Sequence, residues 1–124
     1  MLSPDELQEL EATLLPTLER HHLRLLAHGL RTLQAIAGRR IGELPPDTEV
    51  AAWAADQPLI AADAGFEEAF LTQMGHVATQ LAAVAAAASK EPLGLELADL
   101  VHWATEEADR RLRPPAAPPA PPPG

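Results

Sequence analysis

The sequence predicts an all-α protein, a small bundle of four to five helices with a disordered Pro/Ala-rich C-terminal tail. Leu and Ala, which favour helices, are abundant, whereas Val, Ile and Tyr, which favour strands, are scarce or absent. Leucines recur at helical spacing, and Pro and Gly separate the periodic stretches. Because 124 residues have room for one core of this kind, we expect a single helical domain over residues 1–113.

The first periodic stretch begins at a helix-capping signal. Ser3 is a suitable cap, Pro4 suits the first helical position, and Glu6 stands at the capping-box spacing. Leucines then recur up to Gly38, a residue suited to the left-handed conformation that ends many helices. Pro16 lies inside this stretch and lacks the N–H of a helical residue. We therefore expect either a kink or two separate helices, and the sequence leaves both open.

Three further helices are expected after Gly38. A proline pair precedes a short helix that carries Val50 and Trp53. After a brief apolar piece, Asp63 is placed to cap a long helix over residues 65–89. A break containing Pro and Gly then separates this helix from a last one over residues 96–113.

Residues 114–124 contain only Pro, Ala and Gly, and they hold seven of the thirteen prolines. This composition predicts a disordered tail of the polyproline II type. Such a tail could bind an aromatic-lined groove, but the neighbouring arginines do not stand at the Arg-x-x-Pro-x-x-Pro spacing. The composition favours an extended tether.

Composition excludes several classes of protein. The chain has no Cys, so disulfide frameworks, thiolate zinc sites and cysteine nucleophiles are absent. The N-terminal stretch is acidic and amphipathic, which does not resemble a secretory signal, and we expect a cytoplasmic protein. A formal charge of −9 disfavours nucleic acid and anionic lipid as general partners. Eight arginines against one lysine suggest a GC-rich, bacterial genome.

No catalytic motif is found, so we expect a protein that is not an enzyme and has no cofactor. The spacing Glu19-x-x-His22 matches half of a carboxylate-bridged di-metal site, and Asp99-x-x-His102 matches the other half. On a helical wheel His22 falls in the middle of an apolar stripe, which is formed by Leu18, Leu25, Leu26, Leu33 and Ile36. Asp99 and His102 fall on the polar side of their helix. One half-site would face the core and the other would face solvent, so the two cannot bind a shared pair of metal ions. A metal or small-molecule site at Glu19 and His22 remains an alternative.

Charge is unevenly spread along the chain. Residues 1–19 hold −5, residues 20–40 hold +5 and residues 43–68 hold −7. The positive segment predicts a basic docking face for an acidic protein or a phosphate backbone. Its members are Arg20, Arg24, Arg31, Arg39 and Arg40. Alternatively, acidic segments of the same chain neutralise this face. A regulator that binds nucleic acid is not favoured, because no recognition-helix pattern accompanies the arginines.

The stretch Ala69–Ser89 contains no charged residue over 21 positions. Gln73, His76 and Gln80 argue against insertion into a membrane. One face of the expected helix is apolar and is predicted to join the core: Phe66, Phe70, Met74, Val77, Leu81 and Val84. The opposite face is small and uncharged: Thr72, Gly75, His76, Thr79, Ala83, Ala86 and Ala87.

An uncharged outer face is unusual for a helix turned to solvent. We therefore predict that another protein or a symmetry mate covers this second face, with a homodimer as the commonest arrangement. The function predicted is a non-enzymatic protein–protein interaction module, such as a small subunit, adaptor or assembly factor of a larger complex. A His-dependent binding protein and a nucleic-acid regulator are the alternatives.

Overall fold

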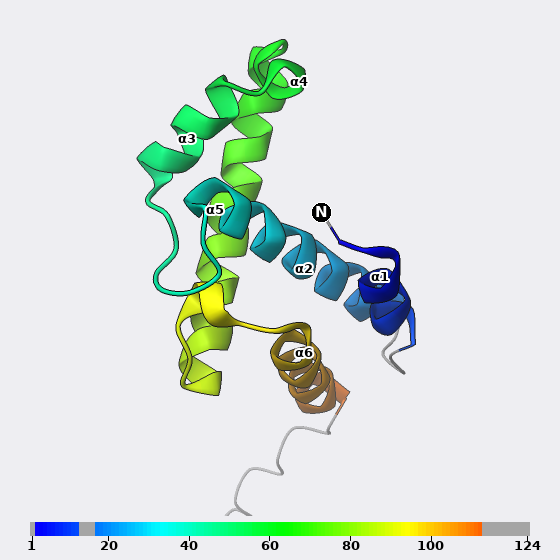
Figure 1. The fold of residues 1–124 in the computed structure, drawn as a ribbon. Helices are drawn as coiled ribbons and strands as arrows, with labels where there is room; N and C mark the ends of the chain where they lie inside the picture. The colour runs from blue at the N-terminus through cyan, green and yellow to red at the C-terminus, as the bar shows by residue number, and fades with distance from the viewer. Residues whose placement is uncertain (1, 13–16, 113–124) are drawn as a thin grey trace, which may run out of the picture.

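The computed structural model describes residues 2–12 and 17–112, and of residues 111–112 it describes only the backbone. The described part of the chain folds into six α-helices and one 3-10 helix, with no strand (Figure 1). The elements are α1 (Pro4–Glu11), α2 (Thr17–Ala37), α3 (Asp47–Ala55), α4 (Pro58–Ala61), α5 (Ala64–Ala88), η1 (Pro92–Gly94) and α6 (Leu97–Leu112). The prediction of an all-α fold is confirmed. The predicted tail, residues 114–124, lies outside the described residues.

The predicted capping box at the start of α1 is present. The backbone N–H of Glu6 donates to Ser3 Oγ at 3.1 Å, and the Ser3 N–H donates to Glu6 Oε1 at 3.1 Å. α1 ends at Glu11 and α2 begins at Thr17, so two helices flank the position where Pro16 predicts a kink or a break. Residues 13–16 themselves lie outside the described part. Together with the single turn of α4, this division accounts for six helices where four to five were expected.

The buried face of α2 differs from the predicted stripe. Its centre is formed by Leu23, Leu26, Leu30 and Leu33, each at most 1% exposed. Leu18 was expected on the stripe but is 74% exposed, and His22 was expected at its middle but is only half-buried. Leucines cover a wide arc of α2, and its contacts with α5 and α6 select which half of that arc is buried. The expected position of His22 at the centre of the core face was wrong.

α2 and α5 pack closely where Gly29 meets Val77. A Cβ atom added to Gly29 would overlap the Val77 side chain, so glycine is required by the distance between the two helices. In Figure 1 α2 crosses α5 near the middle of α5. This crossing, together with the contacts of α2 with α6 and α1, forms the centre of the bundle.

The loop after α2 is tied to the second half of the chain. Gly38 has φ +70°, which confirms the predicted left-handed helix end. The Arg39 guanidinium donates to the carbonyls of Ile41 and Glu43 at 2.6 and 2.8 Å. The carbonyl of Gly42 accepts a hydrogen bond from the Leu93 N–H at 3.0 Å. The loop is therefore held against η1.

Residues 47–72, which we call the arm, project from the bundle (Figure 1). The arm contains α3, α4 and the first part of α5. The rings of Trp53 and Phe70 stack at a tilt with centroids 6.0 Å apart and join α3 to α5. Asp63 caps α5 as predicted, because its Oδ1 accepts from the Phe66 N–H at 3.1 Å. Phe66 was predicted to join the core, and this was wrong: it is 55% exposed.

The far half of α5 packs against η1 and α6. Met74, Val77, Leu81 and Val84 are buried, as the apolar pattern predicts. α5 ends at Ala88, and the residue that caps it, Ser89, has φ +55°. Lys90 Nζ then donates to Asp99 Oδ2 at 2.8 Å across the turn to α6. Asp99 Oδ2 also accepts the Glu96 N–H at 2.8 Å, so this carboxylate stabilises the start of α6.

Candidate interaction surface

The uncharged side of α5 faces solvent along most of the helix. We call the seven residues Thr72, Gly75, His76, Thr79, Ala83, Ala86 and Ala87 the α5 face. Six of these seven are exposed, and Gly75 is half-buried. Thr79 Oγ1 donates to the Gly75 carbonyl at 3.1 Å, so the hydroxyl is satisfied within the helix. The structure therefore brings the predicted partner-binding residues together on one open surface that carries no charge.

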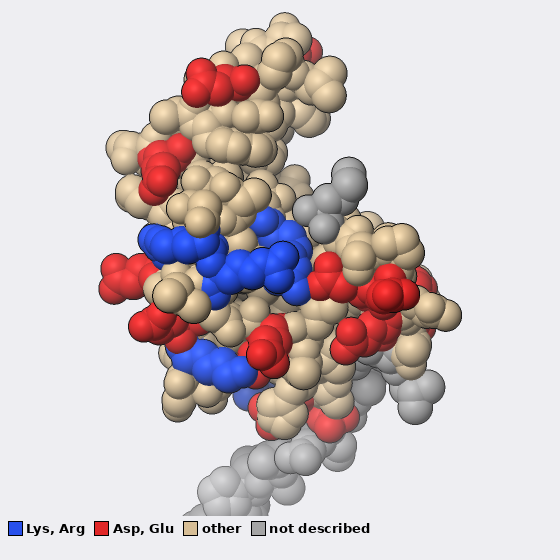
Figure 2. Space-filling view, viewed as in Figure 1, with Lys and Arg blue, Asp and Glu red and all other residues tan. Residues whose placement is uncertain are grey.

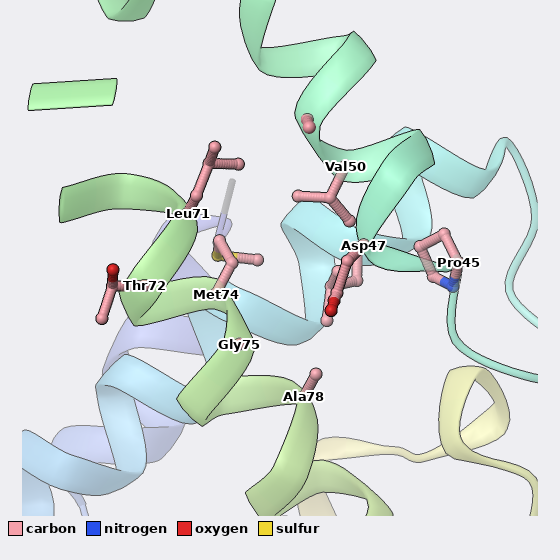
Figure 3. A pocket seen from close by; sticks show the side chains of 10 residues that line it. Pro45, Asp47, Val50, Leu71, Thr72, Met74, Gly75 and Ala78 are labelled. Atoms are coloured by element: carbon pink, nitrogen blue, oxygen red, sulfur yellow. The ribbon is translucent and has the colours of Figure 1, made fainter. Parts of the chain in front are cut away.

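A groove opens at the edge of this face, between α3 and α5, and shares Thr72 and Gly75 with it (Figure 3). Its volume is about 320 Å³. Most of its lining is apolar: Leu33, Pro45, Asp47, Val50, Ala51, Leu71, Thr72, Met74, Gly75 and Ala78. Figure 3 shows Val50 and Asp47 of α3 facing Met74 and Gly75 of α5 across the groove. Gly75 leaves room there, since an added Cβ atom would have no neighbour within 4 Å.

Sequence reasoning did not find this groove. It places Val50 on a short helix and Met74 on a long one, but no local signal puts these two helices side by side. The nearest signal is the small side chains at Gly75 and Ala78, which leave space on α5. Only the packing of α3 on α5 turns that space into a groove.

In Figure 2 the arm shows acidic side chains and no basic ones. The arm holds six carboxylates: Asp47, Glu49, Asp56, Asp63, Glu67 and Glu68. No Lys or Arg occurs between Arg40 and Lys90. Within residues 2–12 and 17–112, none of these six carboxylates forms an ion pair. The arm is therefore a surface of uncompensated negative charge.

The predicted basic docking face divides into two parts. Arg20 and Arg24 form ion pairs with Glu11, and Arg31 Nη2 lies 2.6 Å from Glu6 Oε2. Two carboxylates of α1 therefore offset part of the charge of these three guanidinium groups, in the direction of the alternative that the charge pattern left open.

Arg39 and Arg40 are exposed and, together with Arg31 and Gln34, line a hollow of about 380 Å³. The Arg39 guanidinium is already bonded to backbone carbonyls of its own loop. In Figure 2 the blue side chains gather at the centre of the molecule, with red ones on both sides. Of the five arginines, only the Arg40 side chain forms neither a hydrogen bond nor an ion pair with the described residues.

The two predicted half-sites for a metal do not come together. Glu19 and His22 are half-buried on α2, while His102 is exposed on α6 and lies 3.1 Å from Glu106 Oε1. Asp99 is desolvated, which raises the pKa of its carboxyl. The hydrogen bonds from Lys90 and the Glu96 N–H and the nearby positive charge together outweigh this, and the pKa lies below its ordinary value. Among the described residues, no three or more His, Asp or Glu side chains are grouped to hold a metal ion.

No helix in the described ranges combines the length and the apolar character that crossing a membrane requires. The fold and its surfaces thus define a class: small all-helical proteins with an exposed, uncharged helix face. Residues 2–111 match the family described as NDH complex assembly factor CRR9, and the chain belongs to this family. Comparisons with curated proteins and with solved structures give no match.

Membership in this family bears on the predicted function. Assembly factors are not enzymes, so the prediction of a non-enzymatic protein is confirmed. Of the subunit, adaptor and assembly factor that the sequence left open, the family supports the assembly factor. An assembly factor acts on other proteins, which agrees with the prediction of a protein partner.

Proposed function

We propose that this chain assists assembly of an NDH complex by binding one of its protein subunits through the α5 face. The observation that carries the proposal is the open, uncharged side of a 25-residue helix in a protein whose family consists of assembly factors. The subunit would cover the α5 face in the assembly intermediate. The protein would leave when another subunit takes that place.

The chemistry of the α5 face suits reversible coverage by another helix. Small residues such as Ala83 and Ala87 allow two helix backbones to approach closely. No charged side chain has to be desolvated when the face is covered, which removes the largest cost of burying a polar surface. Thr72 and His76 at the other end supply polar groups that orient the partner.

A symmetry mate is the second occupant that the α5 face would fit. A homodimer would cover the same residues by two-fold symmetry. The α5 face would then stay buried in the dimer until an NDH subunit displaces the second copy.

We also propose the cytoplasmic location that the sequence predicts. Fractionation of the host cells tests this location.

The test compares two variants that each add two carboxylates at exposed helical alanines. Ala83→Glu with Ala87→Glu places two charges on the α5 face, whereas the control, Ala35→Glu with Ala98→Glu, places two charges on exposed positions of α2 and α6. Each tagged protein is purified from its own host, and the co-purifying NDH subunits are quantified by mass spectrometry. Sedimentation velocity of the same samples reports self-association.

We expect the variant of the α5 face to lose the co-purifying subunit by at least about tenfold, since a buried unpaired charge costs several kcal/mol. The control should retain it. Equal recovery of NDH subunits with the wild type and the variant of the α5 face would refute this face as the contact. Loss of a dimer without any change in subunit recovery would assign the face to the symmetry mate instead.

A further inference from the structure

The groove between α3 and α5 has the dimensions of a binding site for side chains. At about 320 Å³ it is about twice the ~150 Å³ that encloses a benzene molecule in a protein interior. Val50, Leu71 and Met74 supply an apolar lining from both sides. Two apolar side chains of about benzene size would therefore fill it.

A carboxylate stands at the edge of this apolar space. Asp47 lines the groove from the first turn of α3, and it has no ion-pair partner among the described residues. The other five carboxylates lie on the same arm, and no basic residue occurs between Arg40 and Lys90. A ligand in this groove would lie in a negative potential.

We infer that this groove binds a basic amphipathic helix of the partner protein, which inserts two apolar side chains and places Lys or Arg beside Asp47. The inference rests on the proposed function, because it supplies the chemistry of the partner segment. Helices that bind in grooves do so through apolar anchors one turn apart. Complementary charge at the rim speeds the encounter and excludes acidic segments. The arm then acts as the recognition element, beside the α5 face that is covered on assembly.

The probe is a synthetic amphipathic helix made of leucine and lysine, with a matched peptide in which glutamate replaces every lysine. Binding to the full chain is measured by isothermal titration calorimetry at about 50 mM and about 300 mM salt, a range over which surface electrostatics are progressively screened. Thermal denaturation of each variant shows that it is folded.

Two variants alter the groove, and each has a matched control. Gly75→Leu places a side chain in the open space of the groove, and Gln73→Leu places the same side chain on an exposed position of α5 that belongs neither to the groove nor to the α5 face. Asp47→Asn removes the carboxylate at the rim, and Asp109→Asn removes an exposed one on α6. Each control introduces the same side chain as the variant that it matches and leaves the protein with the same net charge.

We expect the lysine peptide to bind and the glutamate peptide not to bind. Gly75→Leu should weaken the affinity about tenfold or more, because the anchors lose their space. Asp47→Asn should weaken it about threefold to tenfold, and the effect should shrink at high salt. Both controls should bind within about twofold of the wild type.

Three results would overturn the inference. Equal binding of the two peptides excludes recognition by charge, and unaltered binding by Gly75→Leu excludes the groove. Failure of the lysine peptide to bind at low salt excludes the proposed chemistry altogether. Ala83→Glu with Ala87→Glu should still bind the peptide, because neither residue lines the groove. Failure of the peptide test is thus distinguishable from failure of the α5 face to recruit NDH subunits.

Discussion

Gln34 Nε2 donates a hydrogen bond of 2.8 Å to the carbonyl of Leu93, 59 residues further along the chain. Gln34 is only 5% exposed, and its Oε1 accepts from Arg31 Nη1 at 2.8 Å. Arg31 in turn binds Glu6 through Nε and Nη2. A continuous series of polar contacts therefore links α1 through α2 to η1. It gives both the oxygen and the nitrogen of the buried Gln34 amide a hydrogen-bond partner.

Replacing Gln34 by Ala should lower the free energy of unfolding by about 1–3 kcal/mol, because the Leu93 carbonyl loses its side-chain donor in a buried place. The matched control is Gln73→Ala on the exposed side of α5, which should change it by less than about 0.5 kcal/mol. Urea denaturation measures both. Similar losses for the two variants would show that the buried contact contributes nothing specific.

Two glycine substitutions should shift stability in opposite directions. Gly29→Ala forces its Cβ into Val77 and should lower the free energy of unfolding by about 1–3 kcal/mol. Gly75→Ala meets no neighbour and should raise it by up to about 1 kcal/mol, since alanine is the better helix former. Thermal denaturation of the pair gives the sign. An increase for Gly29→Ala would contradict the close approach of α2 and α5.

Two leucines test the difference between the arm and the core. Leu81 is fully buried on α5, so Leu81→Ala should lower the free energy of unfolding by about 2–5 kcal/mol. Leu59 on α4 is 90% exposed, so Leu59→Ala should change it by less than about 0.5 kcal/mol. Chemical denaturation separates these values readily. A large loss for Leu59→Ala would mean that the tip of the arm packs inside the protein.

Acid should weaken the attachment of α1 through Glu6. The Arg31 guanidinium, and then the Ser3 N–H, hold the pKa of this carboxyl below its ordinary value of 4.5. The lowered pKa means that the ionised form stabilises the fold above pH 4.5, and that this contribution disappears as the pH falls through the folded-state value.

Glu6→Gln should therefore lower the free energy of unfolding by about 1 kcal/mol at pH 7, and by progressively less below pH 4.5. The control Glu9→Gln changes an exposed carboxylate on the same helix and should cost less than about 0.5 kcal/mol across the range. Denaturant titrations at a series of pH values measure both. A difference between wild type and Glu6→Gln that stays constant down to strong acid would contradict the role of the ion pair.

The limits of sequence reasoning appear most clearly in α2 and α5. The spacing of apolar residues predicts both helices, yet it places Leu18 and Phe66 in the core, whereas the structure leaves both exposed. The reason is geometric, since a helix with apolar residues over a wide arc has several possible core faces. Contacts with α5 and α6 decide which face of α2 is buried. At the start of α5 no second layer of helices covers the arm (Figure 1).

What the sequence by itself determined is the class of secondary structure and several helix ends. The capping box of Ser3 and Glu6, the Asp63 cap and the left-handed Gly38 act over a single turn, and such signals are complete within a few residues. The tertiary structure alone decided the groove between α3 and α5, the pairing of Arg31 with Glu6 and the contact of Gln34 with Leu93. These features join residues far apart in the chain, because they depend on which helices pack together.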